Sequence, residues 1–218
     1  MVQGVKTIKK ILKDIPLNTD IEISNGNMKL SKNTIIINMG SATNCPSNIL
    51  GMCNAVKSGV KCYALKAEKL YPNSLKYRER QFTYWRSNSA DSILKDIIRK
   101  ISNRNSNTSI KYIRFNESGD FWDQHDIKKL STIAKRLKNF GIITYGYTAR
   151  YDLDFKHIHF LVKGSGFTKK QAKDINGRTI IINKTDPIPD TFLKCPGSCK
   201  TCDACFKPDK QNIAFIKH

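Results

Sequence analysis

The seven cysteines of this sequence fall into two groups, and clustered cysteines are candidate metal ligands. The first group has gaps of seven and eight residues between its members, and the second places four cysteines within eleven residues. A thiolate needs a metal ion or positive surroundings to stay deprotonated, and a short loop can wrap a single centre. Because seven is an odd number, a fully paired set of disulfides is excluded. We therefore expect metal binding by Cys45, Cys53 and Cys62, and by Cys195, Cys199, Cys202 and Cys205.

The four-cysteine group predicts a closed site, either a four-thiolate zinc site or an iron–sulfur cluster. Its spacing differs from the two separated CxxC knuckles of zinc ribbons and from the CxxCxxCxxxC run of ferredoxins. Since one short loop supplies every ligand, we favour an iron–sulfur cluster and keep zinc as the alternative. A closed centre of this kind can also serve only to hold the C-terminal tail in place.

The three-cysteine group predicts a different kind of site. Three thiolates can hold a [4Fe–4S] cluster and leave one iron open, and an open iron can bind a small ligand or cofactor such as S-adenosylmethionine. Two alternatives remain: a histidine completes a zinc site, or one tail cysteine completes a single shared cluster.

Hydrophobic periodicity predicts an alternation of strands and helices. Strands are expected at 34–38, 110–115, 142–147, 159–162 and 179–182, and helices at 63–70, 76–86, 89–101, 123–137 and 168–175. Ser89 and Asp123 are the expected N-caps of two of these helices. The alternation predicts an α/β fold, either a partial (β/α) barrel or an open parallel sheet, with a cysteine-rich metal-binding C-terminal tail. We divide the chain into an N-terminal arm (1–30), an α/β core (31–186) and a cysteine-rich element packed on that core (187–218).

Polar residues follow the second and third predicted strands, where right-handed crossovers gather the loops at one edge of the sheet. Glu117 and Asp120 can act there as acid, base or cofactor ligand, and Tyr147 and Arg150 would line the mouth of the site. Gly119 suits a tight turn. The alternative for Asp120 is that it, or Asp123, caps the following helix.

The net charge of +20, from 38 basic and 18 acidic residues, predicts an anionic partner, and nucleic acid fits best. Basic drift in a lysine-rich proteome is the alternative. Residues 76–86 combine arginines with aromatics, a combination suited to stacking bases and holding phosphate. The candidate residues are Arg78, Arg80, Trp85 and Arg86. Core packing by the aromatic side chains would explain the same pattern.

Several classes of protein find no support in the sequence. There is no GxxxxGK[ST] phosphate loop, no HExxH and no GxSxG element. No apolar run approaches the ~18–20 residues of a membrane span, and the N-terminal stretch lacks the apolar core of a signal peptide. We expect a cytoplasmic protein, in the host cytoplasm if a phage encodes it. The oligomeric state stays open.

Four segments together resemble the phage "gene product 88" family. They are Cys45-Pro46 with a later Cys62-Tyr63-Ala64, the segment 114–121 (similar to R-x-H-x-SGDF), Tyr147-Thr148-Ala149-Arg150, and the cysteine-rich C-terminus. The resemblance spans about residues 35–205. It implies a compact relative of radical S-adenosylmethionine barrels, in which Asn116, Glu117, Ser118 and Gly119 would contact the cofactor. The cysteine spacing is longer than the common x3 and x2, and the motif has one glycine instead of two.

Three hypotheses follow. The first is an iron–sulfur protein, radical S-adenosylmethionine-like, that acts on or binds nucleic acid. The second is a base-exchanging transglycosylase on a similar barrel, with Asp120 as nucleophile and structural zinc in the tail. The third is a non-enzymatic nucleic-acid-binding protein stapled by metal.

Overall fold

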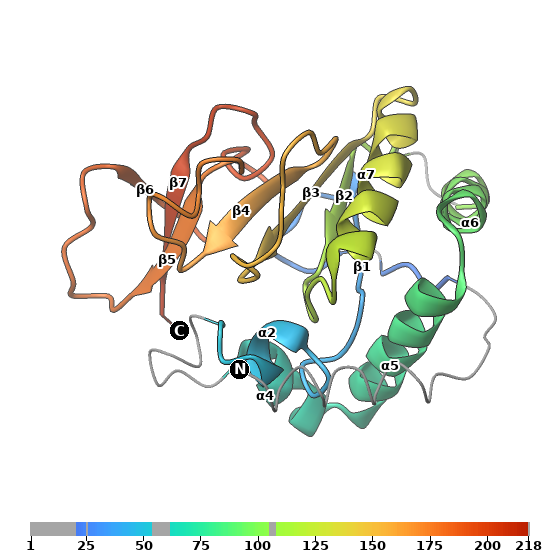
Figure 1. Ribbon diagram of the computed structural model, residues 1–218, viewed down its shortest axis with the longest axis horizontal. Helices are drawn as coiled ribbons and strands as arrows, with labels where there is room; N and C mark the ends of the chain where they lie inside the picture. Colours follow the sequence, from blue (N-terminus) through green and yellow to red (C-terminus); the bar gives the residue numbers. More distant parts are fainter. Residues whose placement is uncertain (1–20, 25, 54–61, 105–107, 218) are drawn as a thin grey trace.

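The computed structural model describes residues 21–24, 26–53, 62–104 and 108–217 (Figure 1). Seven strands form one sheet in which every neighbouring pair is parallel, in the order β1-β2-β3-β4-β5-β7-β6. The strands are β1 (Thr34–Ile37), β2 (Tyr112–Phe115), β3 (Ile143–Thr148), β4 (Leu161–Ser165), β5 (Arg178–Ile182), β6 (Phe192–Lys194) and β7 (Asn212–Ile216). The sheet is open, with β1 and β6 at its edges. The expected open parallel sheet is therefore confirmed, and a closed barrel is not formed.

Five helices accompany the sheet in the part of the chain that the structure describes. They are α2 (Pro46–Ile49), α4 (Tyr63–Leu70), α5 (Pro72–Ser87), α6 (Ala90–Ser102) and α7 (Gln124–Lys138). The two predicted N-caps are confirmed, because the side chain of Ser89 accepts from the Ser92 amide and that of Asp123 from the Asp126 amide. The apolar faces of α6 and α7 join the main hydrophobic core, and α7 packs along β3 (Figure 1).

The two faces of the sheet differ in chemistry. Side chains alternate along a strand, so Ile113 and Phe115 enter the core with the helices while the residues between them face the other way. We call this other side the polar face, made of Tyr112, Arg114, Tyr145, Tyr147 and Lys163, since the register pairs Arg114 with Tyr145 and Tyr147 with Lys163. Strands β1 to β5 follow one another in space as in sequence, and right-handed crossovers then keep their helices on the opposite side.

The tail crosses the polar face because the strand order reverses. Strand β7 lies between β5 and β6, so the connection from β6 to β7 runs back across the sheet. A right-handed connection in this reversed direction passes over the face opposite the helices. Phe206 on this connection stacks on Tyr112, with ring centroids 4.3 Å apart, and on Tyr145 at 5.2 Å. The tail expected as an element packed on the core thus also contributes β6 and β7 to the sheet.

One other expectation needs correction. The helix expected at 168–175 is a series of turns, bounded by Gly166 and Gly177 in left-handed backbone conformations (φ 70° and 102°). Of the expected arm, residues 1–20 lie outside the described residues, and Ser24 forms an antiparallel bridge to Ile36 of β1. No helix in the described part is long and apolar enough to cross a membrane.

Candidate metal site

The first cysteine group leaves the carboxyl end of β1. Cys45 is the N-cap of α2 and Cys62 is the N-cap of α4, so both lie at the start of a helix. Cys53 lies close enough to Cys45 for their charges to interact, and its amide donates to the Ser47 carbonyl at 3.0 Å. Residues 54–61, between Cys53 and Cys62, lie outside the described residues. The cysteine loop thus starts and ends on fixed elements at the sheet edge.

Asp120 ties this loop to the ends of β2 and β3. Its buried carboxylate accepts hydrogen bonds from the Ser47 hydroxyl of α2, the Thr148 hydroxyl at 2.7 Å and the Ala149 amide at 2.9 Å. A fourth hydrogen bond comes from the Phe121 amide at 2.8 Å. Burial raises the pKa of Asp120, and its hydrogen-bond donors oppose that shift. With both oxygens occupied, Asp120 positions three loops relative to one another.

Glu68 of α4 forms a second tie. Its buried carboxylate pairs with Arg78 at 2.9 Å and accepts from the Ala42 amide at 2.8 Å, on the loop that leads to Cys45. The Ser118 hydroxyl donates to the same oxygen at 3.2 Å. The segment after β1, helix α4 and the segment after β2 are therefore joined at one carboxylate.

The residues expected to contact a cofactor all lie at this edge. Ser118 is buried, and its amide donates to the Asn38 side chain at 2.9 Å. Gly119 lies against Gly40 of the cysteine loop, where an added Cβ would be 2.9 Å from the Gly40 nitrogen, and its φ is 81°. The carboxylate of Glu117 accepts from Asn27 at 2.7 Å, and its carbonyl accepts from the Tyr63 hydroxyl. Asn116 is buried, with a φ of 58°.

The other two candidate catalytic residues differ in their surroundings. Arg150 is buried and fully engaged: it pairs with Asp152 at 2.8 Å through two nitrogens and donates to the carbonyls of Phe121 and Trp122 at 2.6 and 2.9 Å. Tyr147 lies on the polar face, where its hydroxyl donates a hydrogen bond to Cys205. Arg150 therefore holds the segments that follow β2 and β3 together, whereas Tyr147 belongs to the tail cysteine site.

The four tail cysteines lie close together on the polar face. The charges of Cys195, Cys202 and Cys205 act on Cys199, and burial raises the pKa of Cys199 to about 11. Burial also raises the pKa of Cys205, which the Tyr147 hydroxyl and the Lys163 ammonium oppose. Lys163 is fully buried, and it donates to the carbonyls of Asn176 and Gln211 at 2.7 and 2.6 Å. The sheet therefore presents a hydroxyl and a cation to these sulfurs.

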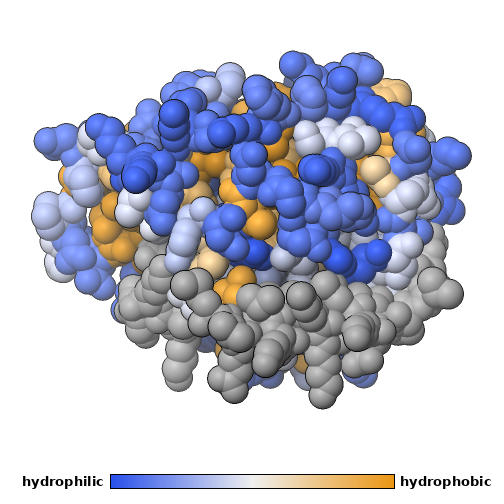
Figure 2. Space-filling view, in the orientation of Figure 1, coloured by the Kyte–Doolittle hydropathy of each residue, from blue (hydrophilic) through white to orange (hydrophobic). Residues whose placement is uncertain are grey.

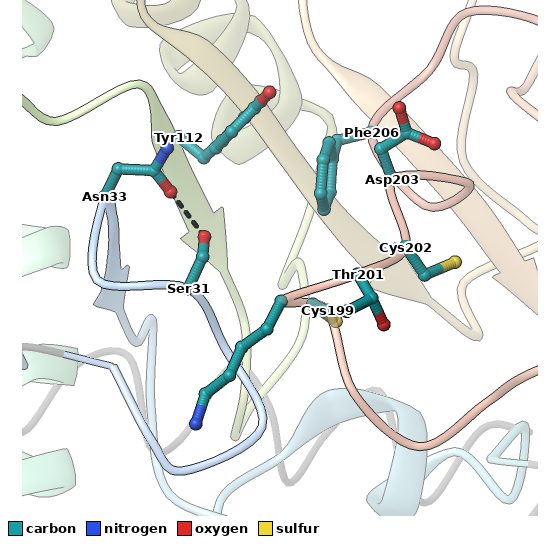
Figure 3. A pocket seen from close by; sticks show the side chains of 9 residues that line it. Ser31, Asn33, Tyr112, Cys199, Thr201, Cys202, Asp203 and Phe206 are labelled. Atoms are coloured by element: carbon teal, nitrogen blue, oxygen red, sulfur yellow. Dashed lines mark hydrogen bonds between the residues drawn. The ribbon is translucent and has the colours of Figure 1, made fainter.

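A cavity of about 390 Å³ opens beside the tail cysteines (Figure 3). Cys199, Cys202 and Phe206 line it from the tail, and Tyr112 and Asn33 from the beginning of β2 and the turn before β1. The cavity thus reaches the tail group from the end of the sheet opposite the first cysteine loop.

Both cysteine groups offer thiolate ligands, which suit zinc as well as iron–sulfur clusters. A single zinc ion bound by thiolates at ~2.3 Å requires sulfurs about 4 Å apart. Within the described residues, which include all seven cysteines, neither group brings three sulfurs within 4.8 Å of one another. None of the seven forms a disulfide, and all are of intermediate burial.

The group that does meet this distance has a simpler explanation. Asp123, His125 and Asp126 lie within 4.8 Å of one another at the start of α7. Asp123 caps the helix, and the buried carboxylate of Asp126 accepts from Trp85 at 2.9 Å and from Arg86 at 2.8 Å. Since these contacts occupy both carboxylates, the group serves the packing of α5 on α7.

The residues expected to hold nucleic acid are mostly internal. Arg78 pairs with Glu68, Trp85 is 1 % exposed, and Arg86 binds Asp126. Arg80 alone among the four is exposed, and it pairs with Glu22. Packing, the alternative explanation, therefore accounts for this helix face. The surface seen in Figure 2 is mainly hydrophilic, and α7 contributes the exposed Lys128, Lys135, Arg136 and Lys138.

The sequence analysis missed the polar face. On β2, Tyr112 and Arg114 alternate with Ile113 and Phe115, and this alternation is a signal of a strand with one polar side. Strands β3 and β4 carry no such signal, because Thr144 and Gly146 flank Tyr145 and Gly164 follows Lys163. No sequence pattern indicated the role of Glu68, because its partners, Arg78 and the Ala42 amide, contact it only in the folded chain.

Comparison with known proteins gives one match. A family model described as Gene product 88 matches residues 9–163, which is more than half of the chain and includes the first cysteine group but not the tail group. No curated protein and no solved structure matches the sequence. The resemblance noted in the cysteine loop, in the segment after β2 and at the end of β3 falls inside the matched range. The chain belongs to the phage Gene product 88 family.

Proposed function

We propose that this chain is an iron–sulfur protein in which Cys45, Cys53 and Cys62 hold one cluster at the carboxyl edge of the sheet. The observation that carries this proposal is that two buried carboxylates hold the cysteine loop in place on either side of Cys45. Asp120 holds it through Ser47, and Glu68 holds it through Ala42. A loop that only connected β1 to α4 would need neither buried carboxylate, whereas a metal loop must present its sulfurs in one geometry.

The surroundings of Cys45 fit a metal ligand. Burial, Asp120 and Cys53 raise the pKa of its thiol, while the backbone amides of Asn48 and Ser47 favour the thiolate. A bound cation would replace the proton and offset the nearby negative charge. With three protein thiolates, a cluster would offer one open iron for a ligand or cofactor. The Asn116–Gly119 segment lies at the same edge to contact it, and we propose S-adenosylmethionine as that cofactor.

We propose a second, closed centre for Cys195, Cys199, Cys202 and Cys205. The hydrogen bond from Tyr147 to Cys205 and the nearby Lys163 ammonium would stabilise negative charge on its thiolates. Zinc remains the alternative metal at this position. Its place on the polar face, away from the loop after β1, supports two centres over a single shared one.

We also propose that nucleic acid is the partner, in the reducing cytoplasm of the host. The charge of +20 supports a polyanion, and the exposed basic residues of α7 offer a surface for phosphates. Because Arg78, Trp85 and Arg86 are engaged in contacts within the protein, we place the proposed nucleic-acid surface on α7 and not on α5. A transglycosylase with Asp120 as nucleophile finds less support, because that carboxylate already accepts four hydrogen bonds.

Serine variants of each cysteine group test this assignment. In anaerobically reconstituted protein, we expect C45S/C53S/C62S to lose about four irons per chain and any response of the electron-spin spectrum to S-adenosylmethionine. The variant C195S/C199S/C202S/C205S should keep that response. If the first variant binds as much iron as wild type, the cluster assignment at the loop is contradicted. If wild type has clusters that never respond to S-adenosylmethionine, only the cofactor assignment fails.

A further inference from the structure

Buried polar atoms without partners gather at the end of β2 and on the neighbouring residue of β3. Among the described residues, seven buried side-chain nitrogen or oxygen atoms have no hydrogen-bond partner. Four of them belong to Arg114 (Nε), Asn116 (Nδ2 and Oδ1) and Tyr145 (the hydroxyl). Arg114 and Tyr145 are register partners on adjacent strands, and Asn116 follows Arg114 by two residues. Because buried polar groups in native proteins nearly always have partners, such a gathering indicates a missing one.

Arg114 shows what kind of partner is missing. Its guanidinium lies over the ring of Tyr147, 5.3 Å from the centroid, and no carboxylate of the described residues lies within the 4.0 Å of an ion pair. The nearest acidic group that acts on it, Glu117, uses its carboxylate to accept from Asn27. Two buried cations among the described residues do have partners: Arg78 pairs with Glu68, and Lys163 donates to two backbone carbonyls.

Asn116, at the same place, combines a left-handed backbone conformation with a buried side-chain amide that has no partner. It is 6 % exposed, with a φ of 58°, and neither atom of its amide has a partner. Tyr145 is 2 % exposed, yet its hydroxyl is also unpaired. A strained backbone and unpaired buried groups both lower stability, and proteins keep such features mainly at functional sites.

We propose that Arg114, Asn116 and Tyr145 form a binding site for an oxyanion, the carboxylate or phosphate group of a ligand that enters on the polar face. The guanidinium and the Tyr145 hydroxyl donate to the anion, together with the side-chain Nδ2–H of Asn116. The Asn116 carbonyl is then free to accept from a donor group of the same ligand. The site needs no bound metal, but it adjoins both proposed centres: the charges of Arg114 and Tyr145 interact with that of Cys199, and Asn116 also belongs to the segment that we propose contacts S-adenosylmethionine.

Calorimetric titration and thermal unfolding test this site with two probes, inorganic phosphate and acetate, against chloride at equal ionic strength. We expect one probe to bind the purified full chain and raise its melting temperature. The stronger of the two distinguishes a phosphate from a carboxylate ligand. Arg114→Gln and Tyr145→Phe should each weaken binding by about tenfold or more. Lys111→Gln removes the same charge from an exposed position one residue before β2, and should bind like wild type.

Unfolding in chloride alone supplies a second readout. Because the Tyr145 hydroxyl has no partner, Tyr145→Phe should keep or raise the unfolding midpoint while it removes the response to the probe. The proposal is overturned if neither probe binds wild type more tightly than Arg114→Gln. It is equally overturned if Tyr145→Phe lowers the midpoint and leaves probe binding unchanged, since the hydroxyl would then be a structural group.

Discussion

Replacement of Asp120 by alanine is expected to lower the free energy of unfolding by about 4 kcal/mol. The variant leaves donors from Ser47, Thr148 and Ala149 without their common acceptor in a buried place. Asp120→Asn should cost about 2 kcal/mol, since one amide oxygen still accepts but the amide nitrogen faces donors. Urea unfolding monitored by tryptophan fluorescence gives both values.

The matched control for this prediction is Asp174→Ala, which removes an exposed carboxylate. It should change the unfolding free energy by less than about 0.5 kcal/mol. A catalytic Asp120 without a structural role would give the opposite result: a stable Asp120→Ala protein with unchanged urea midpoint. That outcome would contradict the tie between the cysteine loop and the ends of β2 and β3.

Replacement of Glu68 by alanine should have a similar effect, about 3–5 kcal/mol, because it leaves the Arg78 guanidinium buried without its counter-ion. The side chains of this pair are only 2 % and 8 % exposed, so solvent screens the interaction little. The double variant Glu68→Leu/Arg78→Met should recover part of the loss, since it removes both charges and keeps the volume. Thermal and urea unfolding of Glu68→Leu, Arg78→Met and the double variant complete the cycle.

Glu79→Ala is the control for Glu68, because Glu79 is an exposed residue of the neighbouring helix α5. It should unfold like wild type. Should Glu68→Ala also unfold like wild type, the carboxylate would not be holding the loop through Ala42. The single Arg78→Met variant should be as destabilised as Glu68→Ala, since each leaves one buried charge unpaired.

Local patterns predicted the elements that form the sheet and its helical face. Ile93, Leu94 and Ile97 repeat at helical spacing, and Ser89 precedes them as a cap, so α6 is readable from neighbouring residues alone. The same is true of α7 behind Asp123. The carboxyl edge followed from the strand order, because parallel strands with right-handed crossovers must place their following loops together.

The parts that sequence patterns missed depend on contacts between distant segments. Strand β6 has three residues, too few for a periodic signal, and it forms only because β7 pairs with it. The charged residues of α5 show the same limit. Arg78 and Arg86 look like a basic surface in the sequence, and only the fold brings Glu68 and Asp126 to them. Asp120 likewise resembles a catalytic acid until its donors from α2 and β3 are in place.

Metal and sulfide analysis of the wild-type chain, purified without oxygen, tests the central claim most directly. The account predicts a brown protein with acid-labile sulfide and iron in equal amounts, about four of each for every cluster, whether the tail holds a second cluster or zinc. A colourless protein that carries zinc at both cysteine groups and no sulfide would contradict it.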